Sequence, residues 1–245
     1  QQDKLLLSER YEAWENVDSK LAHEIKNPLT PIQLTIDRLK SKYHNFDNSV
    51  EKDQFDNHLK TINKQIKQIE SLVNEFSDFA RMPKPIFQKN NLIQILKNNI
   101  TLLKELDTDI KISFFNKKDI IELDCDGDQL NRVFLNIIKN SIESIQEKAL
   151  KNGNFDKIIN IVIKTNSDYI TVIINDNGNG FTDNTIKNIT KPYYTTKEKG
   201  TGLGLSIVSK IINDHSGSIY FKNQKNGAIV EINLPFVKWK LKYLL

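Results

Sequence analysis

The sequence contains a single cysteine, Cys125, among its 245 residues. One thiol excludes an intrachain disulfide framework, so we expect Cys125 to be a buried small side chain in a reducing compartment. No apolar run approaches the roughly 18 to 20 residues that span a bilayer, and no secretory signal pattern opens the chain. We therefore expect a soluble chain, although its start at Gln1 rather than methionine leaves room for a membrane anchor upstream.

The sequence also lacks a concentrated basic stripe. Its 35 basic and 31 acidic residues are scattered along the chain and give a net charge of +4. A nucleic-acid-binding protein usually gathers positive charge on one face, so the charge pattern does not favour nucleic acid as a partner. The length exceeds that of most single domains, which predicts two domains.

Two helical runs with apolar seams open the chain. The first covers residues 1–43, and the second follows a turn of polar residues at 45–49. Apolar residues recur in both runs at steps of three and four, which is the spacing of a coiled-coil seam. The seams comprise Trp14, Val17, Leu21, Ile25, Pro28, Ile32, Ile36, Leu39 and Tyr43 in the first run, and Phe55, Leu59, Ile62, Ile66, Ile69, Val73, Phe76 and Ala80 in the second.

A hairpin of two such helices cannot bury its seam on both sides by itself. Pairing two hairpins into a four-helix bundle buries the seam completely, so we predict a homodimer. The alternative is a monomeric hairpin that docks on the rest of the chain.

Two prolines mark the end of the helical hairpin. Pro83 and Pro85 each disfavour helical geometry in the preceding residue and leave an extended connector. The resulting division is a helical hairpin at 1–81, a linker at 82–90, a second domain at 91–236 and a C-terminal tail at 237–245.

The second domain mixes amphipathic helices with alternating strands. This mixture predicts an α+β fold in which helices are layered on a sheet. The expected helices cover 92–106, about 128–150 and a stretch ending near 214, and the expected strands cover 110–115, 120–123, 158–164, 169–175, 217–222 and 228–234.

Glycines cluster at two points of this domain. Asp176-Asn-Gly-Asn-Gly180 follows a predicted strand, where glycine allows a tight turn and close approach to a flat ligand, although such a run is also a common plain turn. Gly200-Thr-Gly-Leu-Gly-Leu205 opens a predicted helix and offers free N–H groups and the positive end of the helix dipole to phosphates. The chain contains neither the Gly-x-Gly-x-x-Gly pattern of a dinucleotide fold nor a P-loop.

Asn136 and Asn140 lie one turn apart on the long predicted helix, so both amides should face one side. An amide oxygen is a hard neutral ligand that suits Mg²⁺ bound with phosphates, and the plain alternative is a pair of solvated asparagines. Between Gly180 and Gly200 the chain has no clear period and few apolar residues. This composition is expected of a mobile cover over a ligand, with Lys197 placed to reach a phosphate.

His23 falls midway between Leu21 and Ile25 of the first seam, so we expect its side chain to point outward. A histidine kept for packing would lie on the seam, and a metal-binding histidine would have further ligands three or four residues away. The neighbouring residue is Glu24. A solvent-facing histidine beside a carboxylate suits a side chain that is chemically modified.

Five segments together resemble the sensor histidine kinases of two-component signalling, and the resemblance covers nearly the whole chain. The sequence around His23, Ala-His-Glu-Ile-Lys-Asn-Pro-Leu-Thr-Pro-Ile-Gln-Leu, is most similar to that of nitrogen-regulation sensors of the NtrY type. In family order the segments are the phosphoacceptor box Leu21–Pro31, the asparagine box Asn136–Asn140, the first glycine box Asp176–Gly180, the aromatic box Pro192–Lys197 and the second glycine box Gly200–Leu205.

This resemblance implies a dimeric four-helix bundle followed by an α/β sandwich domain of the histidine kinase/chaperone-type ATPase fold. It implies ATP-dependent autophosphorylation of His23, with Glu24 as the neighbouring base. The phosphoryl group would pass to an aspartate of a response regulator receiver domain, of the nitrogen-regulation type. Glu24 and Asn27 also reproduce an arrangement associated with dephosphorylation of that partner.

For the nucleotide, the resemblance implies that Asp176 receives the adenine amino group and that Asn140, helped by Asn136, holds Mg²⁺. Lys197 and the backbone of the second glycine box would cradle the phosphates. The further cofactor-binding positions that it implies are Gly178, Gly180, Thr196, Gly200, Gly202, Leu203 and Gly204.

Two other classes of protein stay open. A non-catalytic dimeric ATP-binding scaffold would keep the fold for partner binding, but its motif residues would not need to be intact. An ATPase of the chaperone or mismatch-repair type would share the pocket and lack the run around His23. The resemblance also implies the cytoplasmic portion of an inner-membrane-anchored sensor, whose membrane segment is absent from this chain.

Overall fold

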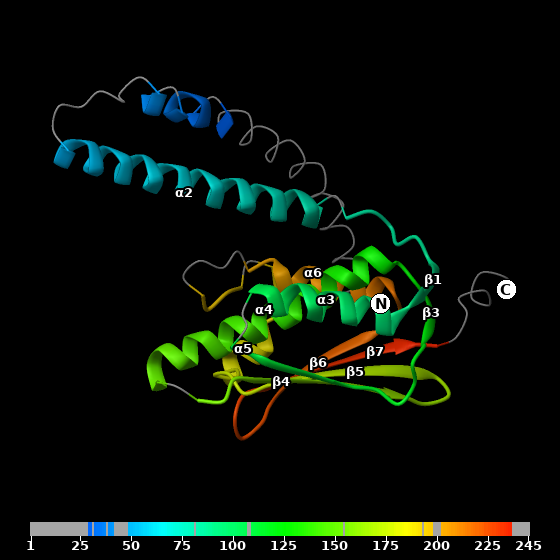
Figure 1. Cartoon of the computed structure of the whole chain (residues 1–245). Helices are drawn as coiled ribbons and strands as arrows, with labels where there is room; N and C mark the ends of the chain where they lie inside the picture. Colours follow the sequence, from blue (N-terminus) through cyan, green and yellow to red (C-terminus); the bar gives the residue numbers. More distant parts are fainter. Residues whose placement is uncertain are drawn as a thin grey trace. The chain divides into compact units, whose positions relative to one another are not determined.

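The computed structural model describes residues 29–30, 32–37, 39–41, 49–80, 82–106, 109–153, 155–192, 194–197 and 202–236 (Figure 1). The chain divides into two compact units, Gln1–Pro83 and Lys84–Leu245. This division lies inside the linker predicted at 82–90. His23, Glu24, Asn27 and the predicted tail at 237–245 lie outside the described residues. Among the helices within these ranges, none is long and apolar enough to cross a membrane.

The first unit is a pair of helical segments. Residues 29–30, 32–37 and 39–41 are helical and run alongside α2 (Ser49–Ala80) (Figure 1). A small apolar core lies between them. It consists of Leu29, Ile36, Leu59 and Ile66, with the partly buried Phe55 packed against it.

Among the seam residues of α2 whose burial the structure describes, only half are buried. Leu59, Ile66 and Val73, which are seven residues apart, are 3%, 4% and 6% exposed. Ile62 and Ile69, which lie between them on the same stripe, are 44% and 40% exposed. The helix therefore shows a heptad pattern in which a single chain covers one row of apolar residues and leaves the other row open.

The second unit is built on a five-stranded sheet. Figure 1 shows α3 (Leu92–Leu106), α4 (Gly127–Asn152) and α6 (Gly204–Asp214) lying over one face of this sheet. In spatial order the strands are β2 (Lys111–Phe115), β4 (Ile158–Thr165), β5 (Tyr169–Asp176), β7 (Ala228–Pro235) and β6 (Ser218–Asn223). The pair β2–β4 is parallel, and the other three pairs are antiparallel.

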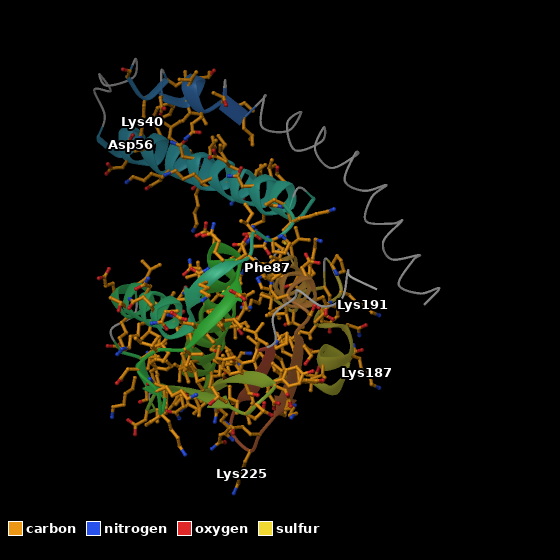
Figure 2. All side chains as sticks on the ribbon, turned by 90° about the vertical axis from the view of Figure 1, so that its right-hand side faces the viewer. Lys40, Asp56, Phe87, Lys187, Lys191 and Lys225 are labelled. Atoms are coloured by element: carbon orange, nitrogen blue, oxygen red, sulfur yellow. The ribbon has the colours of Figure 1, made fainter. Side chains whose placement is uncertain are left out.

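The core of this unit lies between the sheet and the helices. Side chains of β4, β5 and β7 alternate between buried and partly exposed, as expected for strands with one covered face. The side chain of Asp126 caps α4 by accepting a hydrogen bond from the Gln129 N–H. At the other side of the unit, Lys225 lies at the outer tip of the β6–β7 turn (Figure 2). The buried stripe of α4 consists of Gln129, Leu130, Val133, Phe134, Ile137, Ile138, Ser141, Ile142 and Ile145.

Two elements were not predicted from the sequence. The strand β1 (Gln88–Asn91) pairs antiparallel with β3 (Glu122–Cys125), although its own sequence is polar and shows no alternation. The short helix α5 (Asp183–Asn188) lies where an irregular segment was expected, so that expectation is wrong there. Thr182 starts α5 by accepting a hydrogen bond from the Thr185 N–H, a local capping signal that carries no apolar period.

The prediction that Cys125 is buried is confirmed, since its exposed fraction is 0%. Burial raises the pKa of its thiol to about 11. At neutral pH Cys125 is therefore a protonated and unreactive thiol.

The first residues of the second unit contact the beginning of α4 and the end of α6 through hydrogen bonds and ring packing. The Asp126 carboxylate accepts a hydrogen bond from the Ile86 N–H at 2.9 Å, and the Asp126 N–H donates to Nε2 of His215 at 3.0 Å. The other ring nitrogen of His215 lies 2.8 Å from the Ile211 carbonyl oxygen. Phe87 packs against the histidine ring with centroids 5.0 Å apart, and Figure 2 marks its position.

His215 makes the stability of this junction pH-dependent. Burial lowers the pKa of His215 below its usual 6.5, so the folded state favours the neutral ring while the unfolded chain takes up a proton more readily. This contribution to stability is present above the unfolded pKa and is lost as pH falls.

We therefore expect His215→Gln to lower the free energy of unfolding by about 1–3 kcal/mol at neutral pH, because it breaks buried hydrogen bonds. The variant should also lose less stability than the parent between about pH 7.5 and pH 5.5. Thermal unfolding followed by circular dichroism measures both effects. His58→Gln, at an exposed position of α2, is the control, and an equal response of the two variants would contradict the role of His215.

Candidate functional site

A pocket opens between α4, the end of β5 and the β6–β7 hairpin. It has about 350 Å³ of empty space, counted out to its mouth. Its walls are mostly apolar, and Asp176 is the only charged side chain among the described residues that line it. The lining residues are Ile137, Asn140, Ser141, Ser144, Asp176, Gly180, Phe181, Leu205, Phe221, Ala228 and Val230.

Asp176 ends β5 and is 4% exposed. Ser141 on α4 donates a hydrogen bond to its Oδ2 at 3.0 Å, and the Gly178 N–H donates to its Oδ1 at 2.9 Å. Burial raises the pKa of the Asp176 carboxyl, and these hydrogen bonds oppose the rise. The carboxylate is thus held in place at an apolar wall with acceptor capacity left for a donor in the pocket.

Side chains of α4 hydrogen-bond to the backbone of the turn after Asp176. The Lys148 ammonium donates to the carbonyl oxygens of Asn177 and Gly178 at 2.8 and 3.0 Å, and it lies 5.2 Å from the centre of the Phe155 ring. Ser144 accepts a hydrogen bond from the turn as well, from the N–H of the next residue, Asn179. These contacts fix the backbone that forms this side of the pocket.

Glycine is required where two backbones approach closely. A Cβ atom at Gly178 would overlap the Ser144 hydroxyl. A Cβ atom at Gly227, whose φ is +101°, would overlap the Asp176 carbonyl oxygen and lie 2.7 Å from Cα of Asn177. The β6–β7 turn therefore presses against the end of β5 only because position 227 has no side chain.

The asparagine pair of α4 faces two different neighbours. Asn140 lines the pocket, and its Oδ1 accepts a hydrogen bond from the Lys197 ammonium at 3.0 Å. The same ammonium pairs with Oε2 of Glu143. Asn136 faces the first residue of α6, where a Cβ atom at Gly204 would lie 3.5 Å from Oδ1 of Asn136.

The helix α6 begins at Gly204 next to this pair. Its cap residue, Leu203, is buried and provides no side-chain hydrogen bond to the first turn. The N–H groups of that turn can therefore bind an acceptor, as predicted for an anion site. Gly202 has a φ of +72°, and Leu205 lines the pocket. Gly200 lies outside the described residues.

The segment that follows Gly180 is fastened to β6. The side chain of Asn223 accepts a hydrogen bond from the Phe181 N–H at 2.7 Å and donates one to the Phe181 carbonyl oxygen. The rings of Phe181 and Phe221 meet edge to face, 5.9 Å apart. Thr196 is exposed and does not line the pocket, so the structure does not bring this predicted residue into the site.

Several residues of the site were missed by sequence reasoning. Gly227 belongs to an Asn-Gly pair between two strand-like runs, which is a recognised hairpin signal that could have located it. Glu143 and Ser144 lie one turn beyond Asn140 on the same helix, a spacing that could have placed them near the pocket. Lys148, Phe181, Phe221 and Asn223 carry no such signal, because only the folded chain brings them to the turn after Asp176.

Comparison with known protein families identifies the class of this fold. Residues 125–238 match the family described as histidine kinase-, DNA gyrase B- and HSP90-like ATPase. Residues 19–85 match the His Kinase A (phospho-acceptor) domain. The chain thus combines the nucleotide-binding domain of this ATPase class with a phosphoacceptor domain.

Individual relatives agree with these matches. A putative NtrY-like sensor histidine kinase of Rickettsia prowazekii (strain Madrid E) is 38% identical over 243 residues, which are 99% of this chain and 39% of the relative. The nitrogen regulation protein NtrY of Azorhizobium caulinodans is 35% identical over 233 residues, 94% of this chain and 30% of the relative. The crystallised catalytic domain of the histidine kinase ThkA is 26% identical, with a TM-score of 0.55 over 62% of this chain and 96% of that domain.

The chain belongs to the sensor histidine kinases. The resemblance drawn from its five motifs is confirmed, as is the predicted fold class of a helical segment followed by an α+β ATPase-type domain. The chain spans about two fifths or less of the length of these two curated relatives.

Gly227→Ala should disrupt the pocket, because its new methyl group overlaps the backbone of Asp176. We expect it to lower the free energy of unfolding by more than about 3 kcal/mol, since neither strand can move without breaking its ladder. Gly153→Ala is the matched control: its φ is also positive, at +80°, but nothing lies within 4 Å of the added atom. That control should lose only about 1–3 kcal/mol from backbone strain. Denaturant unfolding compares them, and equal losses would contradict the close approach.

Proposed function

We propose that this chain binds ATP with Mg²⁺ in the pocket beside Asp176 and transfers the γ-phosphoryl group to His23. The observation that carries the proposal is the buried Asp176 carboxylate at the wall of an apolar pocket, beside the uncapped start of α6. The family supports it, since both the ATPase and the phosphoacceptor domains match.

The pocket suits a purine. Ile137, Phe181 and Val230 offer apolar surface to a flat ring, and the Asp176 carboxylate can accept a hydrogen bond from the amino group of adenine. A guanine ring would direct a carbonyl oxygen at this carboxylate, and two acceptors facing each other repel. The proposed specificity is therefore for adenine nucleotides.

The start of α6 suits the phosphates. Free N–H groups of its first turn and the positive end of the helix dipole favour an anion near Gly202 and Gly204. Asn140, assisted by Asn136, has the amide oxygens that would hold Mg²⁺, an ion that takes its remaining ligands from phosphate and water. When bound, the metal would neutralise charge on the transferred phosphoryl group.

The phosphoacceptor role of His23 rests on its sequence context and on the match of residues 19–85. In the proposed transfer, an imidazole nitrogen attacks the γ-phosphorus in line, an N–P bond forms, the P–O bond to ADP breaks, and ADP leaves. Glu24 would accept a hydrogen bond from the other ring nitrogen and stabilise the positive charge of the product. The phosphoryl group would then pass to an aspartate of a response regulator. Asn27 would position a water molecule for the opposite reaction, the dephosphorylation of that regulator.

The open row of apolar residues on the hairpin supports a homodimer. Ile62 and Ile69 of α2 and Ile32 and Leu39 of the preceding helical segment are between 38% and 46% exposed. A second hairpin of the same sequence would cover this row and complete a four-helix bundle.

Asp176→Asn tests the nucleotide site. The amide would present either a neutral oxygen or an NH₂ group to adenine, so we expect ATP affinity to fall by about 10- to 100-fold, which corresponds to the 1.5–3 kcal/mol of a hydrogen bond to a charged group. ADP affinity should fall equally, because the lost contact is to the base. Isothermal titration calorimetry measures both, and unchanged affinity with an unchanged unfolding midpoint would refute the assignment.

His23→Gln tests the reaction itself. We expect no acid-labile phosphate on this variant after incubation with γ-labelled ATP, while its ATP affinity stays equal to that of the parent, because residue 23 supplies the nucleophile and no part of the pocket. The same experiment on the parent separates the three classes of protein. A kinase retains acid-labile label, an ATPase of the chaperone type releases free phosphate, and a non-catalytic scaffold does neither.

A further inference from the structure

The ammonium group of Lys197 lies between two side-chain oxygens of α4. It donates to Oδ1 of Asn140 at 3.0 Å and pairs with Oε2 of Glu143. The two oxygens come from residues three apart on one helix, so they face the same side. One of these oxygens is the amide oxygen to which the proposed function assigns Mg²⁺.

Glu143 differs from Asn140 in carrying a full negative charge. Its second carboxylate oxygen lies 4.0 Å from the ammonium of Lys139, a side chain that is 63% exposed. The side chains of Glu143 and Lys197 are 35% and 30% exposed, respectively. Glu143 and Asn140 thus form a two-oxygen cation site in which Lys197 supplies the cation, and Asn140 also lines the pocket.

We propose that Lys197 holds the place of the divalent metal in the nucleotide-free chain, and that Glu143 is a further metal ligand when the metal arrives with the nucleotide. In this exchange the ammonium leaves Asn140 and Glu143 and moves to the phosphates that enter with the metal. The proposal rests on the proposed function, since it concerns the metal of the same ATP site.

Charge balance supports the arrangement both before and after the exchange. Without a cation between them, the Glu143 carboxylate would repel the phosphates of a bound nucleotide. A hard divalent cation prefers anionic and amide oxygens, and Glu143 and Asn140 provide one of each. The released ammonium is a compact charge on a flexible stem that can follow the phosphates. The Glu143 carboxylate would thus face a cation before and after the exchange.

The weakness of the Lys197–Glu143 ion pair also permits the exchange. An ion pair exposed to this degree contributes little to stability, because water and salt screen it. A divalent cation with several oxygen ligands can displace such a contact. A deeply buried pair would not exchange in this way, since its separation would leave a charge uncompensated.

Glu143→Gln tests the metal ligand. We expect Mg²⁺ to raise the ATP affinity of the parent, and we expect this enhancement to fall about tenfold or more in the variant, a loss typical of altered metal sites. The matched control is Glu147→Gln, which makes the same charge change one turn further along α4 at an exposed position. Calorimetric titration of ATP with Mg²⁺ and with EDTA gives the enhancement for each chain, and circular dichroism checks that all three are folded.

Lys197→Met tests the place-holding ammonium without any nucleotide. Mn²⁺, whose free form has an electron paramagnetic resonance signal, serves as the probe. The variant should bind one Mn²⁺ on the order of tenfold tighter than the parent, because the ammonium no longer competes; this factor equals about 1.4 kcal/mol. Adding Glu143→Gln to Lys197→Met should abolish the gain, whereas adding Glu147→Gln should preserve it.

Two results would overturn the proposal. One is a Glu143→Gln variant whose Mg²⁺ enhancement equals that of Glu147→Gln, and the other is a Lys197→Met variant that binds Mn²⁺ no better than the parent. Failure of the proposed function looks different, since the parent itself would then bind no ATP with or without metal. The Mn²⁺ titration needs no nucleotide, so it gives a result in that case as well.

Discussion

The buried carboxylate of Asp176 is the constraint on which the nucleotide site depends. A carboxylate at an apolar wall loses its hydration, and here the hydroxyl of Ser141, backbone N–H groups and the charge of Lys148 compensate for the loss. Those partners come from α4, from the glycine-rich turn and from the start of β7, so these elements must keep their places for the carboxylate to stay satisfied. Lys148 holds the turn after Asp176 by a hydrogen bond to its backbone. Gly227 has no side chain, which allows the β6–β7 turn to approach the backbone of Asp176.

The helix α4 connects this constraint to the rest of the unit. Its first turn is capped by Asp126, which also binds the backbone of Ile86 and the ring of His215 at the end of α6. Its middle carries Asn136 and Asn140, and Ser144 and Lys148 beyond them hold the turn after Asp176, beside the proposed adenine site. One helix therefore links the segment that enters from the helical hairpin to the proposed metal and base sites. The hydrogen bonds of Asp126 connect that segment to the C-terminal end of α6 through His215.

Sequence reasoning recovered the repeating elements and missed the ones whose signals are not periodic. The long helices and most strands of the sheet lie close to their predicted ranges because their apolar periods are regular over many residues. The strand β1 has no such period, since it is defined by pairing with β3 alone. The helix α5 is too short for a period and is set by a local cap. In α2, alternate residues of the predicted seam are buried, and the division into a buried row and an open row depends on which neighbours are present.

The order and chemistry of the motifs were determined by the sequence itself, because residue types such as a buried acid after a strand or glycines before a helix carry their chemistry with them. They were sufficient to identify the family. Tertiary structure decided which of these residues meet: Asp176 with Ser141, Gly204 with Asn136, and Lys197 with Asn140 and Glu143. These contacts join residues as much as 68 positions apart, and no local pattern records them. They arise only when strands and helices pack around one shared core.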